Sequence, residues 1–179
     1  MPDIHAYQKN VPSQMSEQDF IACFGGAYEH SPWIAEAVWN LSTDPDLAAD
    51  QDTAEGIHQS FRSVVDGADQ EAKLALLRAH PDLAGRLAIA RALTVASTAE
   101  QAGADLGKCT AEEFADFQRL NDSYKEKFGF PFILAVRGYQ RTEILKKFKA
   151  RVDNDRATEF NEALSQVHRI ALLRLRDIK

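Results

Sequence analysis

Apolar residues recur every three or four positions along most of the chain, and no alternating strand pairs interrupt the pattern. Such a period predicts amphipathic helices, each with one buried face. The clearest helical stretches cover residues 16–27, 53–66, 110–129, 141–152 and 156–176. Internal repeats and low-complexity segments are absent from the sequence. The pattern therefore predicts an all-α fold, a single-domain helical bundle of about seven to nine helices.

The helix predicted over 110–129 has the most complete boundary signals. Thr110 and Glu113 have the spacing of a capping box, in which each side chain binds the other residue's backbone N–H. Gly129 stands where a residue of left-handed conformation commonly ends a helix. These signals make it the most clearly predicted helix of the sequence.

The run "FGFPFILAV" (128–136) follows that helix, and its apolar residues show neither a helical nor an alternating period. One interpretation is a buried helix or a short strand. The other is that Pro131 bends the chain, so that backbone groups from Phe132 onward face a ligand. The sequence pattern leaves both open.

Composition and charge narrow the class of protein. With 179 residues the chain is expected to form one domain over 1–179, of which 1–15 are a loosely ordered N-terminal tail. The net charge of −6 argues against broad nucleic-acid binding, which requires a basic face. No run approaches the roughly 20 apolar residues of a membrane span. Cys23 and Cys109 are typical of reduced thiols, so we expect a cytoplasmic protein.

His80 stands out in the stretch "AHPDLAG". The proline that follows it disfavours the α conformation at position 80, so the helix over the preceding "EAKLALLR" should stop there. A histidine at a helix C-terminus can give and take a proton near neutral pH. The competing interpretation is a surface histidine that caps the helix end.

Two further groups of polar residues are candidates for ligand contacts. In "STAEQ", Ser97 and Glu100 share a helix face and Gln101 lies one position round, which suits recognition of a polar ring but also fits a solvated helix face. Near the C-terminus, Arg174 lies four residues after Ile170 and hence on the apolar side of its helix. A partly buried arginine requires an anionic or carbonyl partner.

Metal and nucleotide motifs are missing from the sequence. The five histidines show no H-x-x-x-H or H-E-x-x-H spacing, and there is no G-x-G-x-x-G, Walker loop or G-x-S-x-G. We therefore predict no metal site and no cofactor.

Four motifs follow one another in a fixed order: "HPDLAG", "STAEQ", "NDSYKEKFGFPFI" and "RIALLRL", preceded by "YEHSPWIAE". Together they resemble the family of 2-oxo-4-hydroxy-4-carboxy-5-ureidoimidazoline (OHCU) decarboxylases of urate breakdown. The resemblance extends from about residue 16 to residue 176. It implies an all-helical, cofactor-independent homodimer that converts OHCU to (S)-allantoin.

The resemblance also implies which residues act. His80 matches the catalytic histidine of the family, and Glu100 is the second residue tied to the chemistry. The substrate-binding positions that it implies are Pro81, Ser97, Thr98, Ala99, Glu100, Gln101, Phe132, Ile133, Leu134, Ala135, Val136 and Arg174. Two alternatives remain: a non-catalytic helical binding protein on the same scaffold, and a decarboxylase of a related ureido or imidazoline acid.

Overall fold

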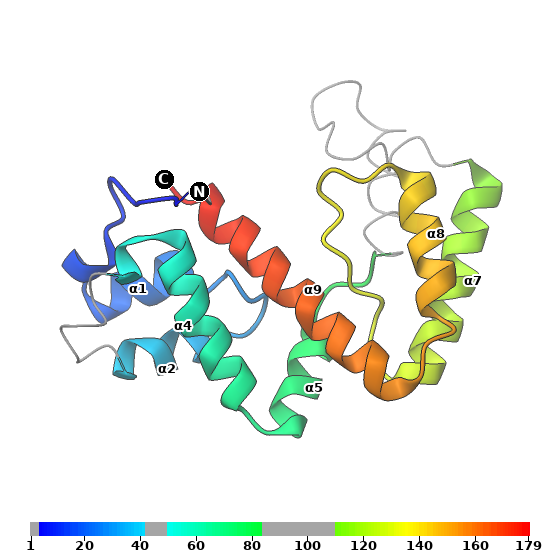
Figure 1. Cartoon of the computed structure of the whole chain (residues 1–179), viewed down its shortest axis with the longest axis horizontal. Coiled ribbons are helices and arrows are strands. Elements are labelled where there is room, and N and C mark those ends of the chain that lie inside the picture. The colour runs from blue at the N-terminus through cyan, green and yellow to red at the C-terminus, as the bar shows by residue number, and fades with distance from the viewer. Residues whose placement is uncertain (1–3, 42–49, 84–109) are drawn as a thin grey trace. The chain divides into compact units, whose positions relative to one another are not determined.

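The computed structural model describes residues 4–41, 50–83 and 110–179, and most of these residues are helical (Figure 1). Within the described ranges the helices are α1 (Glu17–Phe24), α2 (Trp33–Leu41), α4 (Ala54–Gly67), α5 (Gln70–Ala79), α7 (Ala111–Phe128), α8 (Arg141–Arg151) and α9 (Arg156–Asp177), with short 3-10 turns at Pro12–Gln14 and Asp50–Asp52. No strand occurs in these ranges; one isolated bridge joins Ala6 and Thr53. The predicted all-α fold is confirmed.

The chain divides into two compact units. Unit 1 comprises residues up to Ala79 together with Val167–Lys179, and unit 2 comprises His80–Gln166. Helix α9 contributes its first half to unit 2 and its second half to unit 1. None of the helices in the described ranges is long and apolar enough to cross a membrane.

Unit 1 is built around aromatic residues that project from α1, α2 and α4. The Phe20 ring lies 5.1 Å from that of Phe24, 5.4 Å from Trp39 and 6.3 Å from Phe61, measured between centroids. Ser16 caps α1 and Thr53 caps α4 through their side-chain oxygens, and both helices begin where the sequence predicts.

Part of the N-terminal stretch, predicted as a loose tail over 1–15, packs onto unit 1. The backbone of His5 and Tyr7 pairs with Ala54 and Asp52 at the start of α4, and the Tyr7 hydroxyl donates to the Leu175 carbonyl at 2.9 Å. Tyr7 is buried, with an exposed fraction of 6%. Burial of one aromatic side chain and three backbone hydrogen bonds therefore anchor this stretch.

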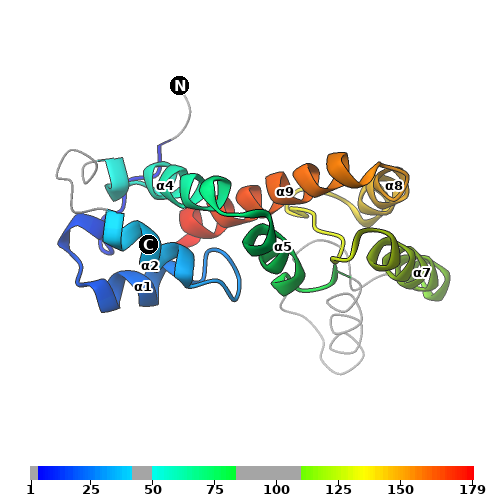
Figure 2. The ribbon, with the colours of Figure 1, turned by 90° about the horizontal axis from the view of Figure 1, so that it is seen from below.

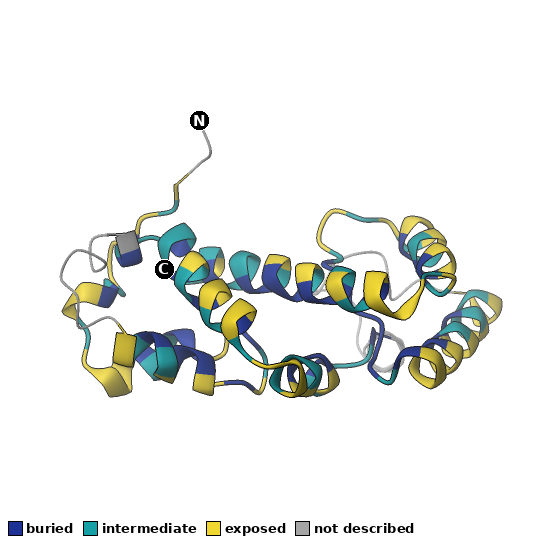
Figure 3. Ribbon diagram, turned by 60° about the horizontal axis from the view of Figure 1, so that its bottom comes forward, coloured by how far each residue is buried: buried dark blue, intermediate teal, exposed yellow. Residues whose placement is uncertain are grey.

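Unit 2 is organised by α7 and α8, which lie side by side in both views (Figures 1 and 2). The predicted capping box of α7 is present, and Gly129 ends the helix with a φ of +80° that L side chains rarely adopt. The core surrounds Tyr124, whose ring contacts those of Phe128, Phe130, Phe132 and Phe148. Buried and exposed residues alternate around each helix, as Figure 3 shows.

Residues 131–136 form neither a helix nor a strand. The side chains are nevertheless buried: Phe132 is 0% and Ile133 1% exposed, and the Phe132 ring stacks on Phe148 with centroids 3.8 Å apart. The interpretation of this run as a buried helix or strand is wrong, because the chain leaves α7 through the left-handed Gly129 and passes a proline that cannot donate a backbone hydrogen bond.

A polar cluster in unit 1, in which Tyr28 and His168 are buried, links α4 to α9. The Tyr28 hydroxyl lies 2.5 Å from His168 Nδ1, and Asp66 Oδ1 lies 3.3 Å from His168 Nε2 without an aligned hydrogen bond. Because a carboxylate only accepts, this arrangement favours a neutral ring with its proton on Nε2 and the tyrosine donating to Nδ1. His58 Nε2 contacts the His168 carbonyl at 2.8 Å. Burial lowers the pKa of both histidines; Asp66 opposes the shift at His168, while the Arg62 charge adds to it.

The lowered pKa values predict a loss of stability in acid. The unfolded chain binds protons at histidine near pH 6.5, whereas the folded chain resists protonation until a lower pH. The stabilisation is therefore complete above pH 6.5 and is lost as the pH falls below it. We expect the melting temperature to fall by roughly 3 °C or more between pH 7.5 and pH 5.5. The variant His168→Gln should show a shallower decline; an equal slope in both proteins would contradict this origin.

Candidate functional site

His80 directly follows the last residue of α5, as the proline at position 81 predicts. Its side chain is buried, with an exposed fraction of 8%, and Leu83 is 4% exposed. The burial of His80 contradicts the interpretation of a surface histidine that only caps a helix. An enclosed imidazole is shielded from bulk water, which suits a proton donor to a bound molecule.

Asp82 holds this stretch against α7. One carboxylate oxygen, Oδ2, accepts a hydrogen bond from Asn121 Nδ2 at 2.7 Å and an ion pair from Lys125 Nζ at 3.1 Å. Asn121 and Lys125 are four residues apart and therefore share one face of α7. The motif "HPDLAG" is thus attached to the motif "NDSYKEKFGFPFI" through two residues of α7.

The side-chain oxygen of Asn121 is buried and lacks a hydrogen bond within the described part of the chain. The residue is 5% exposed, and its Oδ1 has no hydrogen-bond partner among the described residues. Buried amide oxygens are rarely left unpaired. Asn121 therefore keeps a free acceptor in the same unit as His80.

The irregular segment 131–136 begins three residues after α7 ends. Within the described part of the chain, no hydrogen bond joins the backbone N–H groups of Phe132, Ile133, Leu134 or Val136 to another group. These residues are buried or half-buried, and buried N–H groups normally have a partner. The segment therefore offers a short row of donors of the kind that binds carbonyl or carboxylate oxygens.

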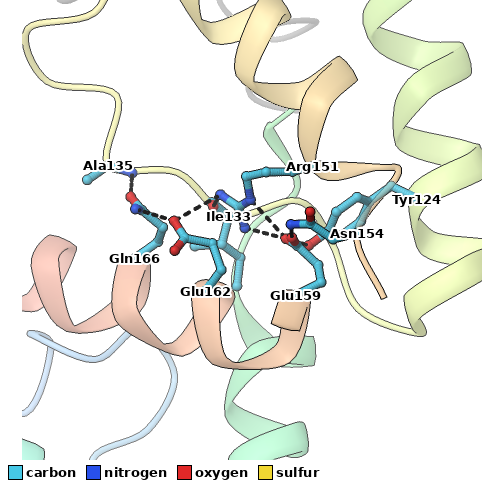
Figure 4. A network of polar contacts seen from close by, with 8 residues as sticks. All are labelled: Tyr124, Ile133, Ala135, Arg151, Asn154, Glu159, Glu162 and Gln166. Carbon is cyan, nitrogen blue, oxygen red and sulfur yellow. Dashed lines mark hydrogen bonds and ion pairs between the residues drawn. The ribbon is translucent and has the colours of Figure 1, made fainter. Parts of the chain in front are cut away.

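Two backbone groups of the segment are occupied by side chains (Figure 4). The Ile133 carbonyl accepts from Arg151 Nη1 at 2.8 Å, and the Ala135 N–H donates to Gln166 Oε1 at 3.0 Å. The guanidinium of Arg151 also lies over the Phe132 ring, 4.6 Å from its centroid. Side chains from α8 and α9 thus hold a stretch that no helix or sheet holds.

The Arg151 guanidinium is itself held by a fully buried carboxylate. Glu159, which is 0% exposed, accepts on Oε1 from Arg151 Nε at 2.9 Å and Nη2 at 2.5 Å. The Tyr124 hydroxyl donates to the same oxygen, and Asn154 Nδ2 donates to Oε2 at 2.8 Å. Burial raises the pKa of Tyr124, and the hydrogen bond to Glu159 adds to the shift, so Tyr124 stays a neutral donor.

A cleft of about 620 Å³ lies within unit 2. Leu134 is the predicted binding residue that lines it, together with Arg151, Glu162 and Gln166 of the polar network and with Tyr139 and Lys147. Lys147 Nζ stands over the Tyr139 ring at 4.8 Å. The network is thus accessible from one side.

The predicted site residues divide as follows. His80, Pro81 and 132–136 belong to unit 2, and α7 holds both stretches there. The predicted positions 97–101, among them Glu100 and Gln101, lie outside the described residues. The described ranges contain no group of three His, Cys, Asp or Glu side chains placed to hold a metal ion.

Arg174 belongs to unit 1, where it has anionic and carbonyl partners of the kind predicted. Its Nη2 pairs with Glu29 Oε2, and its Nη1 lies 3.3 Å from the Ala27 carbonyl. The Arg174 side chain remains 31% exposed. It therefore both ties α9 to the chain after α1 and keeps part of its guanidinium accessible.

Sequence reasoning missed the polar residues that hold the site: Asn121, Tyr124, Arg151, Glu159 and Gln166. A signal was present, because Arg151 continues the apolar stripe of Ile144 and Phe148 at helical spacing. A charged residue on such a stripe indicates a buried ion pair, but the pattern does not name the partner.

The contact between Asn121 and Asp82 predicts unequal effects of two neighbouring substitutions. Asn121→Ala removes a buried hydrogen bond to the Asp82 carboxylate and should lower the free energy of unfolding by about 1–2 kcal/mol. Lys125→Ala removes a half-exposed ion pair and should cost at most about 0.5 kcal/mol. Urea unfolding of both variants checks this; equal losses would show that Asn121 does not anchor the stretch.

Comparison with known proteins extends the likeness over nearly the whole chain. The sequence profile of the family described as OHCU decarboxylase matches residues 13–176. The 2-oxo-4-hydroxy-4-carboxy-5-ureidoimidazoline decarboxylase of Haloferax volcanii is 40% identical over 172 residues, which is 96% of each chain. That of Halalkalicoccus jeotgali is 39% identical over 166 residues, or 93% of this chain and 88% of the relative.

A solved structure has the same fold. The crystal structure of an (S)-allantoin synthase superposes with a TM-score of 0.71 at 32% identity. The match covers 91% of this chain and 50% of that one, so this chain corresponds to half of the solved protein. Since the family profile covers far more than half of the sequence, and the ordered motifs lie within it, this chain belongs to the OHCU decarboxylase family.

Proposed function

We propose that this chain is a carboxy-lyase that converts OHCU to (S)-allantoin in urate degradation. The observation that carries the proposal is membership of the family over residues 13–176, with 40% identity to a decarboxylase of nearly equal extent. The buried His80 and the unpaired N–H groups of the irregular segment give the proposal a structural basis.

The substrate explains why residues without a cofactor suffice. The carbon that loses CO2 carries a hydroxyl and lies next to a ring C=N bond. When the carbon–carbon bond breaks, its electron pair moves into that imine, and the ring nitrogen takes up a proton. The hydroxyl group then loses its proton and becomes the ring carbonyl, while the neighbouring carbon that bears the ureido group takes up a proton, which gives allantoin. The protein therefore has to bind, orient and move protons.

We assign these tasks to the residues that match the family motifs. His80 takes the proton of the hydroxyl group or delivers one to the intermediate. Glu100 orients His80 or binds the N–H groups of the ring and the ureido group, and Gln101 contacts the ring. The backbone of 132–136 fixes the face of the ring, so that protonation gives one enantiomer. Pro81 and residues 97–99 complete the contacts.

Arg174 is assigned to the substrate carboxylate. A guanidinium binds carboxylates in a planar, bidentate geometry, and Arg174 retains an accessible part beside Glu29. The contact of Nη1 with the Ala27 carbonyl holds the guanidinium in unit 1 independently of the ion pair with Glu29.

We also infer that the protein acts in the cytoplasm as a homodimer. The homodimer rests on the family resemblance. The cytoplasmic location rests on the reduced state expected for Cys23 and Cys109 and on a substrate from intermediary metabolism.

The decisive experiment supplies freshly generated OHCU and follows optically active allantoin by circular dichroism. The wild-type chain should accelerate its formation and give the S enantiomer. His80→Asn keeps a polar residue at the helix end but removes the group that titrates near pH 6.5, so the rate should fall on the order of a hundredfold or more.

The same assay, applied to the variant and to the wild type, separates the competing functions. Enantioselective turnover by folded His80→Asn would contradict the catalytic role of His80. A wild-type chain that binds OHCU without turnover would favour the non-catalytic binding protein. Slow turnover of OHCU beside rapid decarboxylation of another ureido acid would favour the related substrate.

Arg174→Met should raise the KM for OHCU about tenfold, because it removes a charged partner of the carboxylate while keeping the stem. Glu29→Gln is the matched control, since it breaks the same ion pair but leaves the guanidinium in place. We expect the control to keep a KM near that of the wild type. If both variants lose melting temperature equally and leave the kinetics unchanged, Arg174 serves only to brace unit 1.

A further inference from the structure

We propose that Gln166 and Arg151 are positioning residues for the proposed decarboxylation: they fix the backbone of 132–136 so that its free N–H groups meet the substrate. The inference rests on the proposed function, because it concerns the segment that is expected to bind OHCU. Neither residue belongs to a motif matched above, and neither is assigned a contact with the reacting atoms.

The segment 131–136 needs support from outside its own backbone. A helix or sheet fixes its peptide planes through its own hydrogen bonds, and 131–136 belongs to neither. The Val136 carbonyl pairs with the N–H of Tyr139, which closes the turn that follows. Between Phe132 and Ala135, the hydrogen bonds to the backbone come from Arg151 and Gln166. Both side chains come from helices, which makes them rigid supports.

The orientation of the Gln166 amide is determined by its hydrogen-bond partners. Its Nε2 donates to Glu162 Oε1 at 2.8 Å, one helical turn earlier on α9. A carboxylate only accepts, so the NH2 group must face Glu162 and the carbonyl oxygen must face the segment. Gln166 Oε1 is therefore directed at the Ala135 N–H, as Figure 4 shows.

Arg151 is held against the Ile133 carbonyl by its other contacts. Two of its nitrogens bind the buried Glu159, and the plane of the guanidinium lies over Phe132. The remaining nitrogen, Nη1, donates to Ile133. With Ile133 held at its carbonyl and Ala135 at its N–H, the peptide plane between Ile133 and Leu134 and that between Leu134 and Ala135 are both fixed.

The backbone groups of the segment therefore fall into two kinds, those anchored by side chains and those available to a ligand. The two anchored groups face the network. The N–H of Leu134 lies on one of the two fixed planes, and those of Ile133 and Val136 lie on the adjoining planes; all three stay without partners among the described residues. Donors that are fixed before binding stabilise developing charge without reorganisation during the reaction. If the anchor is lost, the peptide planes can rotate, and both the rate and the choice of ring face should suffer.

The test uses the full-length chain with three variants. Gln166→Met keeps the volume but removes the acceptor. The exchange Glu162→Gln with Gln166→Glu restores both contacts with the roles reversed, because the new Gln donates to the new Glu, whose other oxygen accepts from Ala135. Asp155→Ala is the matched control on the same helix: it removes the cap that accepts from the N–H groups of Ala157 and Thr158 and does not touch the segment.

We expect Gln166→Met to lower kcat about tenfold with less than a twofold change in KM. It should also lower the enantiomeric excess of allantoin, measured at enzyme concentrations where the background reaction is negligible. The exchanged double variant should recover most of both. Asp155→Ala should lower the melting temperature and leave kcat and enantiomeric excess unchanged. If Gln166→Met fails to fold, Gln166→Asn, whose amide is one carbon too short, takes its place.

Hydrogen exchange of the Ala135 amide separates this inference from the proposed function. The Ala135 amide should exchange at least about tenfold faster in Gln166→Met than in the wild type, with the Gly129 amide, which pairs with Lys125, as the internal reference. An active wild type whose Gln166→Met variant keeps full kcat and enantiomeric excess would overturn the positioning role. An inactive wild type would overturn the proposed function and the positioning role with it, while the exchange data would still report whether Gln166 holds the segment.

Discussion

The carboxylate of Glu159 is fully buried, and the arrangement of unit 2 follows from how that charge is compensated. An isolated ionised carboxyl group in a protein interior is too costly to persist, so it must be surrounded by donors. Here Arg151 supplies two, Tyr124 one and Asn154 one. Each donor comes from a different place in unit 2, namely α8, α7 and the connection before α9. One buried anion therefore ties these parts together.

The same network explains how an irregular stretch can serve as a binding element. Residues 131–136 are apolar and buried or half-buried, yet their peptide groups form no hydrogen bonds of a helix or a sheet. Arg151, which pairs with Glu159, also donates a hydrogen bond to the Ile133 carbonyl, and Gln166 accepts one from the Ala135 N–H. A segment held in this way combines the rigidity of a core with backbone donors that remain available to a ligand.

Local signals in the sequence predicted the helices well, because caps and apolar stripes act over one or two turns. The capping box at Thr110, the left-handed Gly129 and the stop at His80 all have such local causes. The family resemblance supplied the site positions, of which residues 97–101 lie outside the described part of the chain.

The remaining features depend on contacts between distant residues, and a single sequence does not reveal these. The spacing of Arg151 indicates burial, but the partner Glu159 lies on another helix. The attachment of Asp82 to Asn121 joins positions 39 residues apart. Arg174 is partly buried and has a polar partner, as the sequence predicts, but only the structure shows that this partner is Glu29.

The most direct measurement is a double-mutant cycle between Arg151 and Glu159, followed by urea unfolding. Arg151→Met leaves a buried carboxylate without its main partner, and we expect it to lower the free energy of unfolding by about 3–5 kcal/mol. The double variant Arg151→Met with Glu159→Gln leaves no buried charge and should be more stable than Arg151→Met alone. Single substitutions that each cost less than about 1 kcal/mol and add without coupling would contradict the central role of this ion pair.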